Sequence, residues 1–460
     1  LHSRLTPRER LDAWLDLARG RRRIAIGPRS AVFAPLPDLG LLVVDEEHDG
    51  SYKQFDPAPR YHARDVALVR AKTLGAVVIL GSATPSITTR YAAESGKHTL
   101  LTLAGRPFGA MPEVKILDMK QYRPAMRGPL AVPLFRAIET ALSKREQAIL
   151  LLNRRGFASY LQCEACGHIP ESPECSVSLT YHRARNLLLC HYTGYSRRAD
   201  TRCEACGSEE ITLKGSGTEQ VENAVQELFP DARLVRMDRD TTAGRTDHAR
   251  IYTQVLERRA DILIGTQMLA KGLDFPHVTV VGVLQAENEL AFPSWRSSER
   301  LFQLLSQVSG RAGRDRTPGK VFIQTWKPDH PAVRTAREHD YAAFERTERL
   351  LRARSFFPPY SRMVLFHFKG ASKESVALRA TAFTETLRAL TSDGAVLGPS
   401  PAVVERMQGH YHWQVSLKLD SRTTTAQQET LLDRILQHAD RAKPPGTSSV
   451  RITVDVDVVE

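Results

Sequence analysis

Two short polar strings in the first hundred positions have residue types and spacing suited to phosphate chemistry. Asp45-Glu46-Glu47-His48 places carboxylates side by side, and Gly81-Ser82-Ala83-Thr84 places two hydroxyl groups two positions apart. We expect Asp45 to hold Mg²⁺ through water and Glu46 to orient an attacking water molecule. These residue types therefore indicate metal-assisted hydrolysis of ATP.

A third string, Gln307-Val-Ser-Gly-Arg311-Ala-Gly-Arg314, pairs a glutamine with two arginines three positions apart. On a helix this spacing brings both guanidinium groups near one face, where Arg311 and Arg314 can recognise a γ-phosphate beside Gln307. Each string alone is as often structural as functional, since acidic quartets are usually solvated loops and arginine-rich helix ends usually face water. The three strings in this order are typical of nucleic-acid-dependent ATP motors.

Residues 1–128 alternate between strand-like and helix-like patterns that would position the first two strings. Arg23–Gly27, Leu41–Asp45 and Ala76–Leu80 are apolar runs of strand length, and Ala63–Lys72 has helical spacing. Parallel strands deliver the residues that follow them to the carboxyl edge of a sheet, where open α/β folds bind ligands. We therefore expect residues 1–128 to form part of a doubly wound α/β lobe.

A second α/β lobe is expected over residues 129–345, and two tandem lobes of this kind place ATP in the cleft between them. Helices are expected at residues 218–229 and 298–309. Residues 160–212 interrupt this lobe and hold all six cysteines, which indicates an inserted module. The expected strands of the lobe are the apolar runs at residues 148–152, 233–237, 262–264, 278–283 and 321–324.

The pattern changes again towards the carboxyl end, where residues 346–460 are expected to form a small α+β domain. Val364, Phe366 and Phe368 alternate as in a half-buried strand. Further strands are expected at residues 414–419 and 452–456. An apolar helical stripe is expected from Val376, Ala380, Phe383, Leu387 and Leu390.

Composition places few other limits on the protein. The chain has 460 residues, 42% of them hydrophobic, which is ordinary for a globular protein of about three domains. No apolar run has membrane-spanning length, so we expect no membrane partner and a cytoplasmic location. The net charge of +12 is spread along the chain, which suits binding to a phosphate backbone through several folded surfaces.

The cysteines form two near-identical knuckles, Cys163-Glu-Ala-Cys166-Gly and Cys203-Glu-Ala-Cys206-Gly. In each knuckle the two-residue gap and the following glycine let both thiolates face one ion, so two knuckles supply a tetrahedral set. Disulfides are not expected in the cytoplasm. The sequence therefore predicts one structural Zn²⁺ that folds the module and performs no chemistry.

Cys175 and Cys190 remain outside these knuckles, and neither has a partner at knuckle spacing. Two alternatives are open. Either His168, His182 and His191 complete a mixed second site with these thiols, or both thiols are simply buried. We favour a single zinc ion.

The combination of a two-lobe motor with a cysteine-rich insertion resembles the PriA-type primosomal helicase family of helicase superfamily 2. The insertion lies between Asn153-Arg-Arg-Gly-Phe157 and Gly215-Ser-Gly-Thr-Glu219, and the similarity includes residues 26–35, 45–65, 261–272, 307–314 and 397–401. The resemblance implies two tandem RecA-like lobes in an α/β fold. It also implies a replication-restart protein that binds forked or single-stranded DNA, unwinds it 3′ to 5′ with ATP, and works with the replicative helicase loading machinery and single-stranded DNA-binding protein.

The resemblance also implies roles for individual residues. Ser82 and Thr84 would couple the nucleotide state to DNA, and Gly272 and Asp274 match a segment that senses both ligands. Asp45, Glu46, Gln307, Arg311 and Arg314 keep the roles given above. An aromatic-rich loop would contact DNA, because aromatic rings stack on bases while cations follow phosphates; a hinge packed on its own lobe is the alternative. Its residues are Tyr52, Lys53, Phe55, Arg60, Tyr61 and Arg64.

Several positions depart from the family pattern. Ser172 and Thr193 stand where the family has two inner-site cysteines, and Pro28 stands where it has threonine. Gln285 stands where the family has Asp or Asn, and Glu287 stands where it has Asp. The sequence also contains no Gly-x-x-x-x-Gly-Lys-Ser/Thr phosphate loop, which precedes the matched region in the family.

Two functional hypotheses follow from these departures. The first is an ATP-driven DNA helicase represented without its amino-terminal part, supported by the intact Asp45–Glu46 pair and by Arg311 and Arg314. The second is a DNA-structure-binding scaffold that hydrolyses little ATP. In either case we expect these 460 residues alone to be inactive as an ATPase, because no phosphate loop stabilises the transferred group.

Overall fold

A computed structural model describes most of the chain as two compact units. Residues 1–100 with 455–460 form the first unit, and residues 101–454 form the second. The described residues are 1–2, 5–103, 111–152, 160–173, 177–182, 185–214, 218–238, 241, 247–266, 269, 275–312, 319–392, 394–441 and 443–457.

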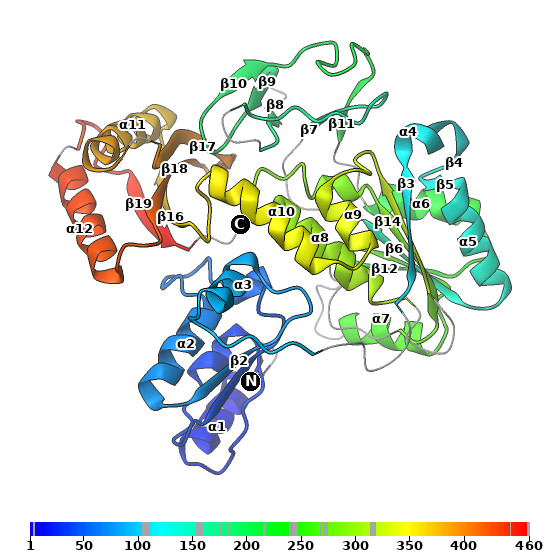
Figure 1. Ribbon diagram of the computed structural model, residues 1–460, viewed down its shortest axis with the longest axis horizontal. Coiled ribbons are helices and arrows are strands. Elements are labelled where there is room, and N and C mark those ends of the chain that lie inside the picture. Colours follow the sequence, from blue (N-terminus) through cyan, green and yellow to red (C-terminus); the bar gives the residue numbers. More distant parts are fainter. Residues whose placement is uncertain are drawn as a thin grey trace. The chain divides into compact units, whose positions relative to one another are not determined.

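Unit 1 contains two short parallel strands with helices beside them (Figure 1). β1 (Leu41–Val44) pairs with β2 (Val77–Leu80) in parallel, so both strands end at the same edge. α2 (Ala63–Leu74) connects them and ends at Gly75, whose φ of 68° closes the helix in the left-handed conformation. The remaining helices are α1 (Pro7–Ala18), η1 (Arg29–Phe33), η2 (Gly50–Tyr52) and α3 (Ile87–Glu94).

One strand expected in unit 1 does not form. The run Arg23–Gly27 has no strand partner, and Ile24 and Ile26 are 78% and 82% exposed. A strand needs a neighbour for its backbone groups, and the described residues place none beside this run. The prediction of a strand there was wrong.

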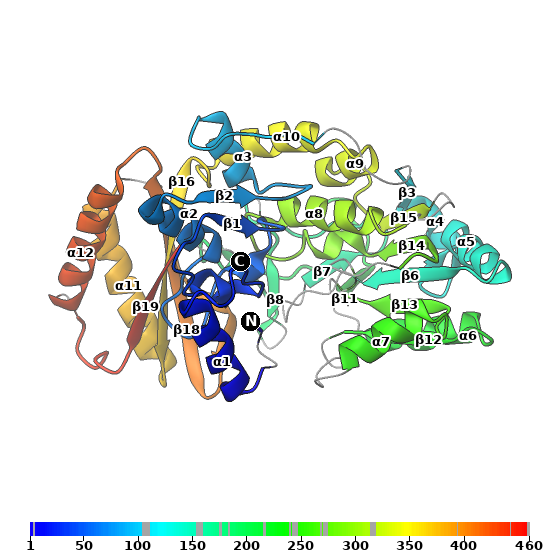
Figure 2. The same ribbon diagram turned by 90° about the horizontal axis from the view of Figure 1, so that it is seen from below.

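Unit 2 is built on a six-stranded sheet in which every neighbouring pair is parallel (Figures 1 and 2). Continuous apolar runs such as Ile262–Gly265 form strands buried on both faces. The sheet confirms the α/β class expected from the sequence. In spatial order the strands are β12 (Leu234–Met237), β13 (Ile262–Gly265), β6 (Gln147–Leu152), β14 (Val278–Leu284), β15 (Lys320–Thr325) and β3 (Glu113–Asp118).

Helices α5 (Val132–Ser143) and α6 (Thr218–Leu228) cover one face of this sheet through a shared apolar cluster. Gly282 allows α5 to approach closely, since a Cβ at this position would lie 2.7 Å from Leu134 Cδ2. The other helices of this part of the chain are α4 (Met119–Tyr122), η3 (Arg123–Ala125), α7 (Asp247–Leu256), η6 (Ala286–Asn288), α8 (Ser297–Ser309), α9 (Pro331–Arg337) and α10 (Tyr341–Arg354). A small hairpin pairs β4 (Met126–Arg127) with β5 (Leu130–Ala131).

The cysteine-rich insertion lies between β6 and α6, as the sequence predicts. It contains an antiparallel pair, β7 (Tyr160–Cys163) with β11 (Ile211–Lys214), which brings the two ends of the insertion together. Its centre is a three-stranded antiparallel sheet of β8 (Thr180–His182), β9 (Leu187–Leu189) and β10 (Ser196–Arg198).

The carboxyl-terminal part is the expected small α+β domain, with a four-stranded sheet in the order β17, β18, β16, β19. Helix α11 (Lys373–Leu390) buries Val376, Ala380, Phe383 and Leu387. Phe383 contacts the rings of Phe366 and Phe368. The remaining elements are β16 (Ser361–Gly370), β17 (Val396–Met407), β18 (His410–Asp420), α12 (Thr425–Arg441) and β19 (Arg451–Val456).

The division into units differs from the expected lobe boundary at residue 128. β3 precedes that boundary, yet it pairs along its whole length with β15 of unit 2. Six residues at the end of the chain, 455–460, belong to unit 1. Among the described residues, no helix combines the length and apolar character needed to cross a membrane.

Candidate metal centre and motor-motif residues

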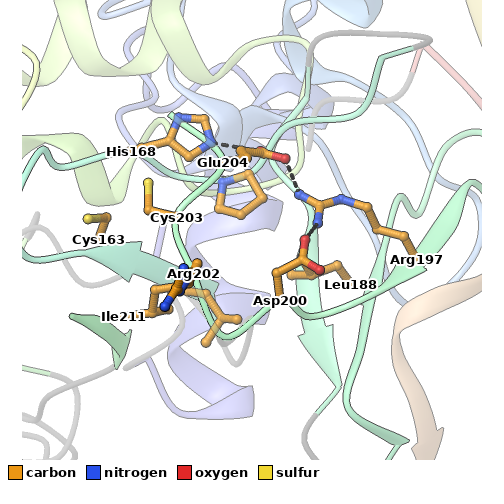
Figure 3. Close-up of a pocket in the computed structure, with 11 residues that line it drawn as sticks. Cys163, His168, Leu188, Arg197, Asp200, Arg202, Cys203, Glu204 and Ile211 are labelled. Carbon is orange, nitrogen blue, oxygen red and sulfur yellow. Dashed lines mark hydrogen bonds and ion pairs between the residues drawn. The ribbon is translucent and has the colours of Figure 1, made fainter. Parts of the chain in front are cut away.

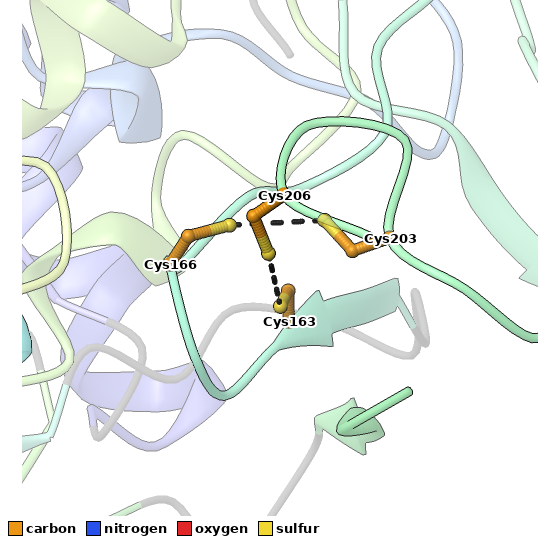
Figure 4. Close-up of side chains that lie close together, drawn as sticks. All are labelled: Cys163, Cys166, Cys203 and Cys206. Carbon is orange, nitrogen blue, oxygen red and sulfur yellow. Dashed lines mark hydrogen bonds between the residues drawn. The ribbon is translucent and has the colours of Figure 1, made fainter. Parts of the chain in front are cut away.

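The four knuckle cysteines lie together and have the geometry of a zinc site (Figure 4). The ligand atoms of Cys163, Cys166, Cys203 and Cys206 are all within 4.8 Å of one another. Two of the Sγ–Sγ distances, Cys163 to Cys206 and Cys166 to Cys203, are 3.7 Å. Four thiolates at the usual Zn–S distance of about 2.3 Å on a tetrahedron are about 3.8 Å apart. The cluster therefore fits one Zn²⁺ with no open coordination position.

The backbone of the two knuckles is nearly identical. The N–H groups of Gly167 and Gly207 each donate to the carbonyl of the first cysteine in their knuckle at 2.8 Å. Both glycines have a positive φ, 74° and 76°, which other residues adopt at a cost. A Cβ on Gly167 would also lie 2.3 Å from the Cβ of Trp326, which directly follows β15. The glycine of each sequence motif is thus required by the turn that aims two thiols at one point.

The surroundings shift the pKa values of two of these thiols in opposite directions. Although burial raises it, backbone N–H groups of Cys166 and Ala165 lower the pKa of the Cys163 thiol to about 7. Burial and the neighbouring thiols raise the pKa of Cys166 to about 12 despite the His168 backbone N–H. A zinc ion deprotonates coordinating thiols outright, so its binding would release protons from this cluster.

A chain of ion pairs ties one knuckle to the central sheet of the insertion (Figure 3). His168 Nε2 lies 2.8 Å from Glu204 Oε1, and Arg197 on β10 donates to Glu204 and Asp200 at 2.6 Å each. These residues line a pocket beside the cysteines. His168 therefore contacts a carboxylate outside the cysteine cluster and is not a fifth ligand.

Among the described residues, Cys190 belongs to no group of metal ligands. Cys175 lies outside the part of the chain that is described. Cys190 is fully buried in an apolar cluster with Leu179, Leu188 and Tyr192. The environment of Cys190 agrees with the interpretation of that thiol as a buried side chain.

In unit 1, the structure brings the first two motor strings together at the carboxyl end of β1 and β2. His48 Nδ1 lies 2.7 Å from Ser82 Oγ, and the Thr84 backbone N–H donates to the same hydroxyl at 3.0 Å. Glu46 follows the strand with a φ of 48°, and its Oε2 lies 3.6 Å from His48 Nδ1. Asp45 is exposed at the strand end. His48 therefore links the carboxylate string to the hydroxyl string.

Glu47 is the structural centre of this region, and the sequence patterns gave no sign of it. Its carboxylate is 1% exposed and accepts hydrogen bonds from the Ser86 backbone N–H at 2.6 Å and the Thr89 hydroxyl at 2.8 Å. Arg64 on α2 forms an ion pair with it at 3.2 Å. Glu47 thus ties the end of β1 to the start of α3 and to α2.

Replacing Glu47 with alanine should destabilise unit 1 on the order of 3 kcal/mol, because the Arg64 cation and the capping donors of α3 would lose their buried acceptor. We expect faster limited proteolysis within residues 45–90 and a lower unfolding midpoint. Glu94→Ala, which removes an exposed i,i+4 pair with Arg90, is the matched control. Equal midpoints for Glu47→Ala and wild type would contradict this assignment.

Most residues of the expected DNA-binding loop make contacts inside unit 1. Tyr52 donates its hydroxyl to the Asp45 carbonyl at 2.6 Å, and burial together with Asp45, Asp49 and Glu46 raises the pKa of this phenol. Tyr61 packs its ring edge-on against Phe33. Phe55, in contrast, is 49% exposed.

The cations of this loop also make contacts inside unit 1. Lys53 is 1% exposed, and its ammonium forms an ion pair with Asp455 at 2.8 Å and donates to the Arg60 carbonyl at 2.9 Å. Arg60 donates to the Phe55 carbonyl, and Arg64 is committed to Glu47. Lys53 and Arg64 are therefore internal ion-pair partners in this structure, because buried carboxylates compete with any phosphate for their charge.

The third motor string is only partly on a helix. Gln307 lies in the last turn of α8, but the helix ends at Ser309, whose hydroxyl donates back to the Leu305 carbonyl at 2.7 Å. Gly310 follows as a poor helix former, and Arg311 lies in the turn beyond it. The helix expected at residues 298–309 is confirmed, and Arg311 lies just beyond its end. Arg314, Gly272 and Asp274 lie outside the described residues.

The architecture and the site together define a class. The chain has a parallel sheet with helices packed on it, a carboxylate string and a hydroxyl string at strand ends, and a Cys₄ insertion. These features are typical of an α/β protein of the RecA-like helicase type that carries a zinc module.

Sequence comparisons identify the family. Residues 353–459 match the Primosomal protein N C-terminal domain, and residues 173–198, between the two knuckles, match the PriA DNA helicase Cys-rich region domain. The chain is 41% identical to replication restart protein PriA of Bacillus subtilis, covering 96% of this chain and 55% of that protein. It is 38% identical to PriA of Chlamydia muridarum, covering 100% of this chain and 61% of that protein. The chain therefore belongs to the PriA family, and it spans little more than half the length of these relatives.

Among solved structures, the chain is similar to the DUF1998 helicase MrfA bound to DNA, with 14% identity and a TM-score of 0.40 over 74% of this chain and 40% of that one. A likeness of this size carries no argument about function.

Proposed function

We propose that this chain supplies motor, zinc and carboxyl-terminal parts of a replication-restart DNA helicase that binds forked DNA and unwinds it 3′ to 5′ with ATP. Unwinding would allow primosome assembly and loading of the replicative helicase, with single-stranded DNA-binding protein as a further partner. The family match supports the proposal, since the curated relatives are named replication restart proteins.

The observation that carries the proposal is the joining of two motor strings in unit 1. Asp45 and Glu46 stand directly after β1, and Ser82 stands two residues after the end of the parallel strand β2. The 2.7 Å contact from His48 to Ser82 couples them. In the proposed mechanism Asp45 holds Mg²⁺, Glu46 orients the water, and His48 passes a change at the nucleotide to the Ser82–Thr84 segment.

The other cofactor and site assignments are part of the same proposal. One Zn²⁺ held by Cys163, Cys166, Cys203 and Cys206 would stabilise the insertion. Gln307, Arg311 and Arg314 would face the γ-phosphate, and Gly272 and Asp274 would respond to both ligands. ATP and Mg²⁺ would bind only when a phosphate-binding loop is also supplied.

Strand displacement from a labelled fork by the complete protein tests the proposal. We expect unwinding that requires ATP and a 3′ single-stranded arm on the tracked strand. A substrate with only a 5′ arm is the control. Absence of ATP-dependent displacement from every forked substrate would contradict the helicase assignment.

One observation favours a second candidate, a DNA-binding scaffold with little ATP turnover. Glu287, at a position where the family has Asp, is 1% exposed, and burial raises the pKa of its carboxyl despite a hydrogen bond from the Trp326 backbone N–H. A buried carboxylate that accepts a backbone hydrogen bond stabilises the fold. The scaffold predicts tight fork binding without unwinding in the same experiment.

Phe55 is the loop aromatic available for stacking, so Phe55→Ala should weaken binding of single-stranded DNA by about 1–3 kcal/mol, or roughly 5- to 150-fold in Kd. Fluorescence anisotropy with a labelled oligonucleotide at fixed salt measures this loss. Phe33→Ala, which removes an aromatic packed against Tyr61, is the comparison for general damage to unit 1. An unchanged Kd for Phe55→Ala would remove this loop from the DNA interface.

A further inference from the structure

Three buried polar atoms on the insertion hairpin have no hydrogen-bond partner. They are Thr180 Oγ1, His182 Nε2 and His191 Nε2. In the register of β8 with β9, Thr180 lies opposite Leu189 and His182 lies opposite Leu187. Cross-strand partners share a face of a sheet, and side chains alternate along a strand. Thr180 and His182 therefore share one face of the hairpin, and His191 follows Leu189 by two positions.

The other face of the hairpin is apolar. Leu179, Leu188, Cys190 and Tyr192 form its buried cluster. Cys190 belongs to this apolar cluster, which contains neither His182 nor His191. The histidine pair is also separate from the Cys₄ cluster, which contains neither imidazole.

The face with the histidines contacts the carboxyl-terminal domain. The His191 carbonyl accepts hydrogen bonds from Gln414 Nε2 at 2.6 Å and from the Ser400 hydroxyl. His191 Nδ1 lies 2.7 Å from the Pro401 carbonyl oxygen. These contacts join the end of the hairpin to β17 and β18.

The Pro401 contact fixes the tautomer of His191. A carbonyl oxygen can only accept, so Nδ1 carries the hydrogen and Nε2 of the neutral ring carries a lone pair. Burial lowers the pKa of this imidazole to about 4, since His191 is only 1% exposed. Histidines that bind metals commonly donate the other ring N–H to a backbone carbonyl in this way.

A buried nitrogen lone pair that accepts no hydrogen bond costs about 1–3 kcal/mol. A water molecule or an ion bound at that lone pair is a usual explanation. The separation of the rings distinguishes these explanations. The ring centroids of His182 and His191 are 5.4 Å apart, with planes at 57°. Two imidazoles on one tetrahedral Zn²⁺, with Zn–N of about 2.1 Å and a ring radius of about 1.1 Å, have centroids about 5.2 Å apart.

We propose that His182 and His191 bind a second divalent transition-metal ion, Zn²⁺ by donor type, through their Nε2 atoms at the contact between the insertion and the carboxyl-terminal domain. The donor set is imidazole, in contrast to the thiolates of the Cys₄ site. An ion here stabilises the hairpin against β17, because His191 is bonded to Pro401 of that strand.

The surrounding charges set the strength of this site. Glu405 of β17 is the carboxylate whose charge acts on both imidazoles. It is also paired with Lys373 at 2.5 Å and Arg185 at 3.4 Å, and these two cations oppose metal binding. The second ion has two imidazole ligands and water in its remaining positions, and the charge of Glu405 is already balanced by the two cations. It is therefore held more weakly than the ion bound by four thiolates.

Metal counting on the purified chain tests the proposal. After equilibration with excess Zn²⁺ and removal of free metal by rapid desalting, we expect two zinc ions per chain in wild type. We expect one in His182→Gln and one in His191→Gln, since either change removes one of two ligands. His410→Gln, which alters an imidazole hydrogen-bonded only to the nearby Gln408 carbonyl, should keep two.

Retention of one tightly held ion shows that each variant still folds its Cys₄ knuckles. Cobalt gives a second readout: the Cys₄ site shows intense thiolate charge-transfer absorption, whereas an imidazole site adds weaker bands without it. A single ion in saturated wild type, or a second ion that persists in both histidine variants, would overturn the proposal.

Discussion

Replacing Cys203 with serine should reduce tightly bound zinc at the knuckles from one ion per chain to less than about a tenth. Structural zinc contributes about 10–16 kcal/mol of apparent binding free energy in zinc-finger peptides, which exceeds the total stability of many domains. Three ligands cannot close the tetrahedron that the 3.7 Å sulfur separations define. We therefore expect the insertion to unfold, visible as rapid proteolysis within residues 160–212.

Cys190→Ala is the matched control for this change. Cys190 is also fully buried in the insertion, but it lies in the apolar cluster and not at the knuckles. We expect this variant to keep the chelator-resistant ion and to lose only a modest amount of stability through the small cavity. If the two variants lost this ion equally, the thiol assignment would be wrong.

The second large effect concerns Arg311. In a complete, active protein, Arg311→Ala should lower ATP turnover about 1,000-fold or more, because an arginine at the γ-phosphate stabilises charge that develops in the transition state. Arg311→Lys should restore little, since a lysine lacks the planar pair of donors. Steady-state phosphate release with saturating DNA measures the loss.

Arg337→Ala provides the comparison, because Arg337 is an exposed arginine on α9 of the same unit. Fork binding measured without nucleotide should be equal in wild type, Arg311→Ala and Arg337→Ala. Full ATP turnover by Arg311→Ala would exclude this arginine from the nucleotide site.

The sequence predicted elements with a strong local pattern. The apolar runs at residues 262–264 and 278–283 became buried parallel strands within one residue at each end. The knuckle spacing predicted the four thiols that meet at one point. In both cases the signal lies within a few neighbouring residues, where strand burial or turn geometry is determined.

Features that depend on distant partners were missed. The burial of Lys53 depends on Asp455, which is close to the opposite end of the chain. Glu47 was indistinguishable from its acidic neighbours until α2 and α3 surrounded it with Arg64 and Thr89. The strand Val396–Met407 contains two prolines and two register shifts against β18, so its sequence lacks regular alternation.

The histidine pair shows the same limit. Proximity in the sequence suggested that His182 and His191 could share a site with Cys190. In the structure the two imidazole rings lie near each other, whereas the thiol belongs to an apolar cluster that contains neither histidine, which the residue spacing alone did not reveal.

ATP turnover of the complete protein on forked DNA, compared between wild type and Glu46→Gln, tests the central claim most directly. Glu46→Gln keeps the size of a side chain that follows β1 but removes the carboxylate that would orient the water. We predict turnover that rises when forked DNA is added to wild type and falls at least about 100-fold in the variant. A flat baseline in wild type, unchanged by forked DNA and by Glu46→Gln, would contradict the motor and leave a DNA-binding scaffold.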